Sequence, residues 1–409
     1  MDSVRRGTLT NLGTRTLAVG GVLLITTLTA RLGAEVQGAF ALFTSVEGAL
    51  LALLSGFGVA LARRVSHHGE DPRALLTAVA LCCIGLGALA ALALLVLAHW
   101  GPPGYASLWV LAIGAPLLLV APNLAGLWLG AGRMAPMAAL TLAPPWLALG
   151  LMAALWWAGQ ASLAGVLGAW VGAKVAVGLA LLTLLWRAAR LAAPDWLALR
   201  AELPFVAAIG VTNLVGLLNY RVGLLVVERT LGLAATGVYS IAVMVAELLW
   251  FVSSSLTQAV YGRIGTPERA AAAATTLRAV RLSAGALLLA APMLWLLARG
   301  LIPWVLGPAY ADSLWPLALL LPGMAVFGGA SALSAYFTNH AGLPRVPAQV
   351  AALSLVVNAA LALLLVPRMG MAGAALAATL SYTTAVAVLA WRFARHAGLP
   401  LARLLPGTS

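Results

Sequence analysis

Long apolar runs alternate with short polar links along the whole chain, and this pattern limits its fold more than any other feature. Of the 409 residues, 63% are hydrophobic and 9% are charged, and the mean hydropathy is +1.01. A soluble domain is nearer to half apolar and a quarter charged. This chain therefore has too few polar side chains to cover a water-soluble particle. Because about 20 apolar residues span a bilayer as one helix, the sequence predicts an all-α, polytopic membrane protein.

The apolar runs predict about twelve transmembrane helices. Proline and glycine interrupt several of them, and such breaks are tolerated where neighbouring helices satisfy the exposed backbone groups. The predicted spans are residues 9–32, 38–61, 74–98, 105–129, 135–158, 163–186, 204–228, 236–262, 279–300, 313–337, 347–366 and 371–394.

The basic residues predict the orientation of these spans. The net charge is +13, with 24 basic against 11 acidic residues. No basic patch is interleaved with aromatic residues, so nucleic acid is not an expected partner. With a cytoplasmic N-terminus, seventeen arginines fall in inside segments and four in outside segments, in agreement with the positive-inside rule. Both termini are then cytoplasmic. Of the two longest inside links, 187–203 and 263–278, the second is alanine-rich and is predicted to lie as a helix on the inner surface.

An internal repeat divides the chain. Gly33 and Arg64 recur as Gly232 and Arg263, 199 positions later in both cases, each within similar neighbouring residues. Six helices per half would give both halves the same orientation. We therefore predict two pseudo-symmetric six-helix bundles around a central cavity. The predicted domains are 1–190 for the N-terminal bundle, 191–203 for a cytoplasmic linker and 204–409 for the C-terminal bundle.

A distinctive stretch lies near the C-terminus, NAALALLLVPRMGMAGAALAATLSY, from Asn358 to Tyr382. Pro367 is predicted to end one apolar helix, because proline lacks an N–H and clashes with the preceding turn. Gly370 and Gly373 would let the chain reverse and pack closely. This pattern resembles the oligosaccharide flippases of the polysaccharide-biosynthesis family, within the multidrug/oligosaccharidyl-lipid/polysaccharide exporter superfamily.

The resemblance extends over essentially the whole chain, including the opening from Asn11 to Phe40 and the tripeptide Asn219-Tyr220-Arg221. One departure is Gly223, where members of the family often carry aspartate, so no role of that aspartate is carried over. Membership would imply two six-helix lobes forming a V. It would also imply transport by alternating access of an undecaprenyl-diphosphate-linked oligosaccharide from the inner to the outer leaflet, for surface polysaccharide or lipopolysaccharide.

The same resemblance implies a location and partners. The location would be the bacterial cytoplasmic membrane. The partners would be the lipid-linked oligosaccharide, membrane lipids and a polysaccharide polymerase or chain-length protein. The oligomeric state is left open.

Ionisable residues at membrane depth are the candidate functional residues, because they are costly there and rarely face lipid. Glu47 and Glu247 are expected to face either the cavity or a tight helix–helix interface. A buried carboxylic acid that retains its proton can carry it, so these two are candidates for ion or proton coupling.

Three cations are candidates for binding a pyrophosphate, which favours Arg and Lys in a poorly hydrated site. Arg221 would either bind the phosphate or extend to the outer headgroups. Lys174 would bind it, pair with Trp170 one turn away, or bridge to a glutamate on another helix. Arg15, in the inner third of the first helix, would meet entering phosphate or mark the interface.

No motif predicts an enzyme, a metal site or a cofactor. The five histidines lack ligand spacing, and Cys82 and Cys83 are adjacent within an apolar run. Besides the flippase, two functions stay open. One is a drug or organic-cation antiporter of the same superfamily. The other, less favoured, is a membrane-embedded glycosyltransferase or polymerase, which would be expected to carry a larger external loop.

Overall fold

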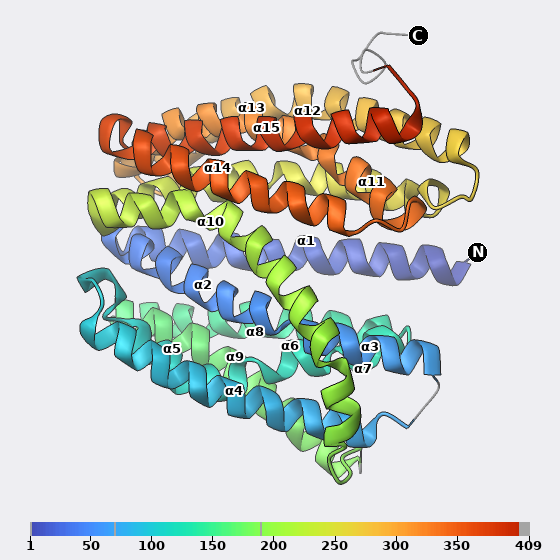
Figure 1. The fold of residues 1–409 in the computed structure, drawn as a ribbon. Helices are drawn as coiled ribbons and strands as arrows, with labels where there is room; N and C mark the ends of the chain where they lie inside the picture. The colour runs from blue at the N-terminus through green and yellow to red at the C-terminus, as the bar shows by residue number, and fades with distance from the viewer. Residues whose placement is uncertain (1, 69–70, 189, 401–409) are drawn as a thin grey trace. The chain divides into compact units, whose positions relative to one another are not determined.

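The structure is a computed structural model that describes residues 2–68, 71–188 and 190–400. Within helices, it describes the backbone but not the side chains of residues 2–12, 15, 67, 68, 251, 252, 259, 329 and 330. All regular structure in the described ranges is helical (Figure 1). Contacts between Cα positions divide the chain into two units, Met1–Leu217 and Leu218–Ser409, with the division inside one long helix, α10. The predicted domains, with a linker at 191–203, stay a prediction.

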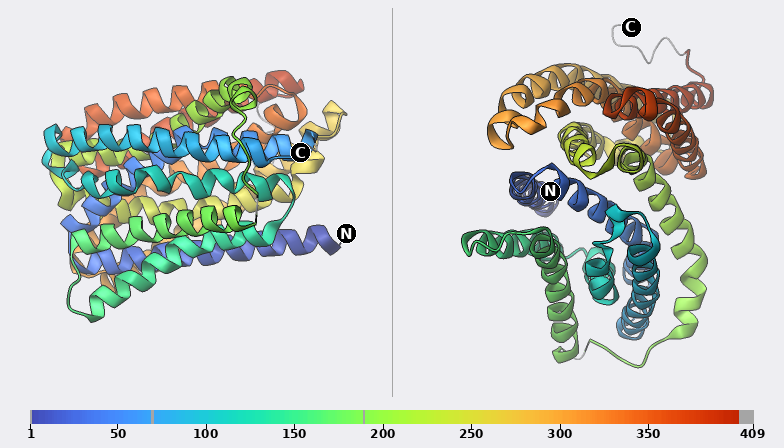
Figure 2. Two further views of the ribbon diagram at one scale, coloured as in Figure 1. Left: turned by 90° about the horizontal axis from the view of Figure 1, so that it is seen from below. Right: turned by 90° about the vertical axis from the view of Figure 1, so that its left-hand side faces the viewer.

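The first unit is built from α1 to α9 and the beginning of α10. Helix α4 packs on α5, α1 on α8, and α9 on both α5 and α8; Figure 2 shows the helices of this unit running side by side. The elements are α1 (Asp2–Arg31), α2 (Ala34–Leu54), α3 (Gly56–His68), α4 (Arg73–Trp100), the 3-10 turn η1 (Pro103–Tyr105), α5 (Leu108–Leu118), α6 (Val120–Leu124), α7 (Gly126–Gly130), α8 (Met134–Trp157) and α9 (Leu163–Arg187).

The second unit contains the end of α10 and all later elements. Helix α15 packs on α13 and α14, and α12 packs on α11 and α13. The elements are α10 (Trp196–Glu247), α11 (Leu249–Ile264), α12 (Arg269–Val305), the 3-10 turn η2 (Pro308–Ser313), α13 (Leu314–Ala335), the π-helical turn η3 (Tyr336–His340), α14 (Arg345–Met369) and α15 (Met371–Ala397).

The predicted spans coincide with apolar helices. Ten helical segments of the described chain are long and apolar enough to cross a membrane. One of them, Trp196–Glu247, bends at Gly232 and so contains the seventh predicted span and the start of the eighth. The first predicted span corresponds to a shorter apolar helix, Thr16–Arg31. Hydropathy therefore located the apolar helices of the described chain, although it did not predict the breaks within them.

The internal repeat is reflected in the backbone. Gly33, between α1 and α2, has φ of 119°, and Gly232, at the bend in α10, has φ of 83°. Only glycine adopts such values without strain. The same sharp change of direction therefore occurs 199 positions apart, as the sequence repeat predicted.

A buried asparagine satisfies backbone groups where the helices of the first unit are interrupted. The chain from Leu108 to Gly130 is divided into α5, α6 and α7, with Pro116 inside α5. Asn123, only 2% exposed, accepts a hydrogen bond from the backbone N–H of Gly58 at 3.0 Å and donates to the carbonyl of Leu119 at 2.9 Å. No water is available in the bilayer core to satisfy backbone N–H and carbonyl groups that a helix break leaves unpaired. The Asn123 side chain supplies these hydrogen bonds instead.

Two sequence predictions about helices are wrong in detail. The alanine-rich segment is not a separate surface helix, since α12 runs without interruption from Arg269 to Val305. Ala272 and Ala273 are buried in the apolar core of the second unit. Their small side chains allow close packing rather than surface contact. Helix α14 also continues past Pro367 to Met369, and Gly370, with φ of 61°, ends it.

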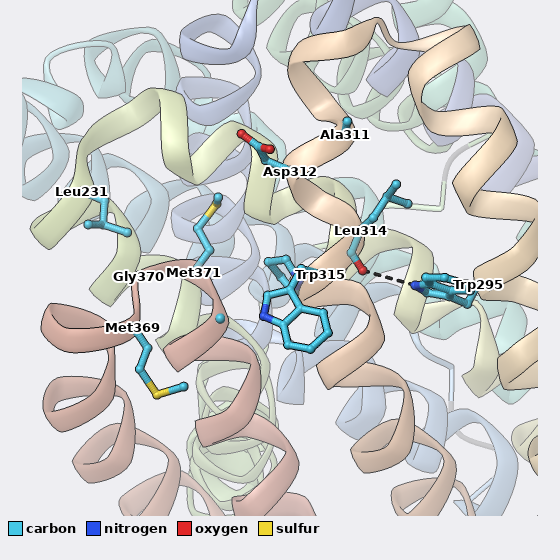
Figure 3. Close-up of a pocket in the computed structure, with 11 residues that line it drawn as sticks. Leu231, Trp295, Ala311, Asp312, Leu314, Trp315, Met369, Gly370 and Met371 are labelled. Carbon is cyan, nitrogen blue, oxygen red and sulfur yellow. Dashed lines mark hydrogen bonds between the residues drawn. The ribbon is translucent and has the colours of Figure 1, made fainter.

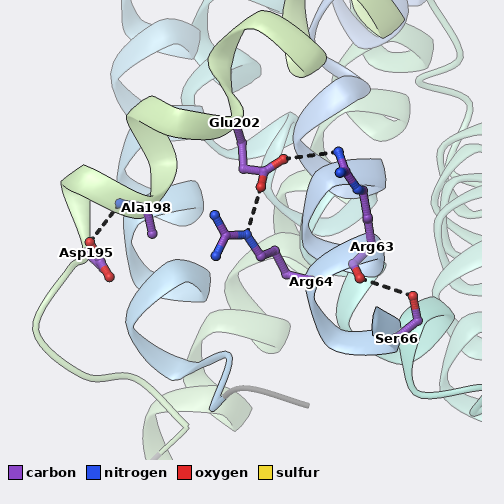
Figure 4. A network of polar contacts seen from close by, with 6 residues as sticks. All are labelled: Arg63, Arg64, Ser66, Asp195, Ala198 and Glu202. Atoms are coloured by element: carbon purple, nitrogen blue, oxygen red, sulfur yellow. Dashed lines mark hydrogen bonds and ion pairs between the residues drawn. The ribbon is translucent and has the colours of Figure 1, made fainter. Parts of the chain in front are cut away.

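A carboxylate joins the first part of α10 to the end of α3 (Figure 4). Glu202 accepts a hydrogen bond from Arg64 Nε at 2.7 Å, and Arg63 Nη1 lies 4.0 Å from its other oxygen. The Glu202 side chain is 10% exposed and that of Arg64 is 21% exposed. By contrast, Asp71 and Arg73 form a pair at 2.5 Å in which both side chains are about half exposed. The hydrogen bond from Arg73 lowers the pKa of the Asp71 carboxyl below its usual range.

We predict that Glu202→Gln destabilises the protein and that Asp71→Asn does not. Removing one partner of a mostly buried pair leaves the other unpaired, which costs about 2 kcal/mol after allowance for partial exposure. That corresponds to about 4–8 °C in the midpoint of thermal unfolding. Fluorescence-detected unfolding in detergent measures it. Equal midpoints for the two variants would show that Glu202 does not hold α10 to α3.

Candidate functional site

The first unit contains a buried ion pair at membrane depth. Glu47, on α2, pairs with Lys174, on α9, and its other oxygen accepts a hydrogen bond from Trp170 Nε1 at 2.6 Å. Lys174 Nζ lies 4.0 Å from the centre of the Trp170 ring, a cation–π contact. Glu47 is 2% exposed. Because residues 170 and 174 are one turn apart on one helix face, α9 presents both groups to the same carboxylate.

A cavity of about 310 Å³ borders this pair within the first unit. Its walls are apolar side chains such as Leu51, Leu118 and Met137, with Thr141 as a polar group and Lys174 as the charged one. The volume is at the lower end of the range for small-molecule sites. The cavity could therefore hold an apolar compound beside an ammonium group already neutralised by Glu47.

The second unit contains a looser ion pair. Arg221 and Glu247 both belong to α10, on the two sides of the bend at Gly232, and Arg221 Nη1 lies 3.6 Å from Glu247 Oε1. Their side chains are 30% and 24% exposed. The bend in α10 thus brings together two residues that are 26 positions apart in the sequence. Longer separation and greater exposure make this pair easier to break than the one in the first unit.

Four aromatic rings pack beside the second pair: Tyr220, Trp250, Phe327 and Tyr382. The rings of Tyr220 and Trp250 are 4.2 Å apart, and those of Phe327 and Tyr382 are 5.0 Å apart. A small enclosed space of about 10 Å³ is bounded by Tyr220, Tyr382, Glu247 and Asn358 among others. That is about the volume needed for one water molecule or a small cation.

The asparagine and serine of the C-terminal stretch belong to a buried polar network. Asn358 Nδ2 donates to the backbone carbonyl of Asn219 at 2.8 Å, and Asn219 Nδ2 donates to Ser354 Oγ at 3.0 Å. Ser354 Oγ and Ser381 Oγ are 2.8 Å apart. All four residues are at most 3% exposed. The network joins α10, α14 and α15, so these residues hold three helices together, as interhelical polar groups do in membranes.

One atom of this network has no partner. Asn358 Oδ1 is buried and accepts no hydrogen bond from any described residue. An unpaired buried acceptor is costly. Since Asn358 also borders the small space next to Glu247, this oxygen is suited to a proton donor or a cation there.

The structure explains the departure at Gly223. A Cβ atom at this position would lie 3.1 Å from the hydroxyl oxygen of Tyr239 and 3.6 Å from Cβ of Ala374. Tyr239, only 2% exposed, thus fills the space that a longer side chain would need. Arg221 pairs with Glu247 instead.

Four of the five sequence-predicted site residues therefore form two pairs. Glu47 and Lys174 meet in the first unit, and Arg221 and Glu247 meet in the second. The side chain of Arg15 lies outside the described residues. The roles of all five in binding and coupling stay predictions. Asn123 and Asn219 were not singled out as functional, although an amide within an apolar run is a signal that could have identified them.

We predict that Glu47 and Lys174 depend on each other for stability. Glu47→Gln or Lys174→Met alone leaves one buried group without its opposite charge, at a cost of about 3–5 kcal/mol. The double variant should recover most of that loss, because two neutral groups of similar size replace the pair. Thermal unfolding in detergent and abundance in the membrane measure it. Glu35→Gln, on an exposed position of the same helix, is the control. A double variant no more stable than the worse single variant would contradict the pairing.

No known family profile matches the chain, and no curated protein matches it by sequence. Solved structures do resemble it. An inward-facing conformation of a multidrug resistance MATE family transporter of the MOP superfamily has a TM-score of 0.78 and 16% identity, over 96% of this chain and 94% of that chain. An outward-facing conformation of such a transporter has a TM-score of 0.67 and 16% identity, over 97% of this chain and 95% of that chain.

A MOP superfamily transporter from Pyrococcus furiosus, described as having reversed polarity of its binding pocket, has a TM-score of 0.65 and 15% identity, over 97% of this chain and 95% of that chain. At this level of identity the likeness concerns the fold. The prediction of an all-α, polytopic membrane protein is confirmed, and the chain has the helical fold of MATE family transporters.

Proposed function

We propose that this protein is a membrane exporter of organic cations or apolar drug-like compounds, and that it works by alternating access. The sequence pattern pointed first to a lipid-linked oligosaccharide as substrate. The structural likeness favours the alternative, because the transporters that share the fold in both inward- and outward-facing conformations are described as multidrug resistance proteins.

The observation that carries this proposal is the pairing of the two described candidate cations. Lys174 is engaged by Glu47 and Arg221 by Glu247. A diphosphate leaving the headgroup region needs cations that are available to it. Carboxylates that can exchange one cationic partner for another suit a cationic substrate or a coupling ion.

Glu247 is the proposed coupling residue. Its contact with Arg221 is 3.6 Å long and its side chain is 24% exposed, so a proton or another cation can compete with the guanidinium. The unpartnered Asn358 Oδ1 borders the same small space. Glu47, with both carboxylate oxygens engaged, is the second candidate and would need to release Lys174 first.

A flippase for lipid-linked oligosaccharide is the second candidate function. The observation that favours it is the exposure of Arg221, whose guanidinium has room to turn from Glu247 to phosphate oxygens. In that case the partners would be the lipid-linked oligosaccharide and a polymerase or chain-length protein. For either function, we propose the bacterial cytoplasmic membrane with both termini on the cytoplasmic side.

We predict that proteoliposomes containing the protein transport ethidium when a proton or sodium gradient is applied. Glu247→Gln should reduce gradient-driven transport about tenfold or more, because the exchangeable charge is lost. Glu268→Gln, on the exposed residue before α12, should have no effect. Arg221→Ala separates the two functions. It should change the ion dependence of ethidium transport without abolishing it, because Glu247 loses its competing partner, whereas a flippase would lose surface polysaccharide. Absence of ethidium transport together with loss of surface polysaccharide would favour the flippase.

We also predict the orientation. In a variant without Cys82 and Cys83, single cysteines at Ser66 and Thr266 should react only from the cytoplasmic side. A cysteine at Gly101 should react only from outside. An impermeant maleimide applied to intact cells and to inverted vesicles measures this. Reaction of the Ser66 cysteine from outside would reverse the orientation.

A further inference from the structure

A large cavity lies within the second unit, and neither Arg221 nor Glu247 is among the described residues that line it. Its volume is about 610 Å³, and Figure 3 shows the residues that line it. They come from the bend in α10 (Leu231), from α12 (Trp295), from η2 and the start of α13 (Asp312, Trp315), and from the α14–α15 turn (Met369, Met371). The positive-inside pattern assigns these turns, together with Arg229 and Arg368, to the outer side of the membrane.

The lining has the chemistry of a site for a bulky cation. Trp315 provides an indole ring, and Trp295 provides a second one that Arg299 already contacts, with the guanidinium carbon 5.8 Å from the ring centre. Met369 and Met371 provide polarisable sulfur atoms that adapt to different shapes. Asp312 is the single carboxylate, and no arginine or lysine is among the described residues that line the cavity. Arg368, next to Met369 in sequence, donates to the carbonyl of Leu364 at 2.7 Å on its own helix.

Asp312 and Trp315 are placed to act together. Asp312 is in η2 and Trp315 is in the first turn of α13, three positions later in a continuous helical stretch, which puts the two on the same side of it. Figure 3 shows Asp312, Trp315 and Met371 lining the same cavity. Asp312 is exposed and has no hydrogen-bond or ion-pair partner among the described residues. Trp315 is 65% exposed, whereas Trp295 is held by a hydrogen bond to the carbonyl of Leu314 at 3.3 Å.

We propose that this cavity is a second, peripheral binding site for a lipophilic organic monocation, for example a quaternary ammonium or phosphonium compound. Such a cation cannot donate hydrogen bonds and is weakly hydrated. It gains from indole faces and from a nearby carboxylate, while its apolar body occupies the space between the methionines. A phosphate-bearing or anionic ligand would meet Asp312 and no counter-charge among the described lining residues.

This site does not depend on the proposed transport function. All of its residues belong to the second unit, and binding there requires neither a gradient nor movement of the two ion pairs. A protein that transports glycans could have it, and an exporter could lack it. The test therefore measures occupancy of the cavity and not transport.

The experiment uses the full chain without Cys82 and Cys83 and with Ala311→Cys, a position in the cavity wall. The protein is placed in nanodiscs of phosphatidylethanolamine and phosphatidylglycerol, which contain no quaternary ammonium. Tetraphenylphosphonium should slow the reaction of this cysteine with a water-soluble maleimide by about fivefold or more at saturation. The neutral triphenylphosphine oxide, of similar shape, should not slow it.

Variants identify the groups responsible. Asp312→Asn should weaken protection by tetraphenylphosphonium about tenfold, a difference of about 1.4 kcal/mol. Trp315→Phe should retain most of the protection by tetraphenylphosphonium, and Trp315→Ala should lose it. As a control, Asp195→Asn in the first unit should leave the protection of the Ala311 cysteine unchanged. A reporter cysteine placed at Gly101 instead of Ala311 should not be protected.

Three results would overturn the proposal. Absence of protection would make Trp315 an interfacial anchor only. Equal protection by the phosphine oxide would make the cavity a purely apolar one. Protection that persists in Asp312→Asn would remove the carboxylate from the site. In each of these three cases, ethidium transport by the Asp312→Asn variant would show that the proposed transport function still holds although the second binding site does not.

Discussion

A charged side chain within an apolar helix must find a partner inside its own protein, and both units are organised by this requirement. In the first unit, Glu47 is neutralised by Lys174 and also accepts a hydrogen bond from Trp170. In the second, α10 bends at Gly232 so that Arg221 can reach Glu247. Without these partners the desolvation of each charge would exceed what the surrounding apolar contacts contribute. The positions of α2, α9 and α10 therefore follow from electrostatics as much as from packing.

Neutral polar groups meet the same requirement where helices are interrupted or joined. Asn123 satisfies the backbone at the break among α5, α6 and α7, and Asn358 links α14 to the backbone of α10. An amide can donate and accept at once, and Asn123 does both at the helix break without bringing a charge into the bilayer. Asn358 uses only its N–H, as a donor to the backbone of α10.

Local features of the fold could be predicted from the sequence, and long-range ones could not. Hydropathy located the spans, and Gly33 and Gly232 marked equivalent bends, because both signals are read from neighbouring residues. The partner of Glu47 lies 127 positions away, and hydropathy says nothing about which helix faces which. The alanine-rich start of α12 was misplaced for a related reason. Alanine suits a tight interface as well as a surface, and only the residues packed against Ala272 and Ala273 distinguish the two.

The two ion pairs differ in a way that assigns them different tasks. Glu47 has both oxygens engaged and is almost fully buried, so a change of partner there must disturb α2 and α9 together. Glu247 is held by one contact of 3.6 Å, is partly exposed, and lies beside the unpartnered oxygen of Asn358. Breaking the second pair therefore removes less attraction, and the unpartnered oxygen of Asn358 borders the same small space. This difference is the basis for proposing Glu247, rather than Glu47, as the residue that exchanges a proton or ion.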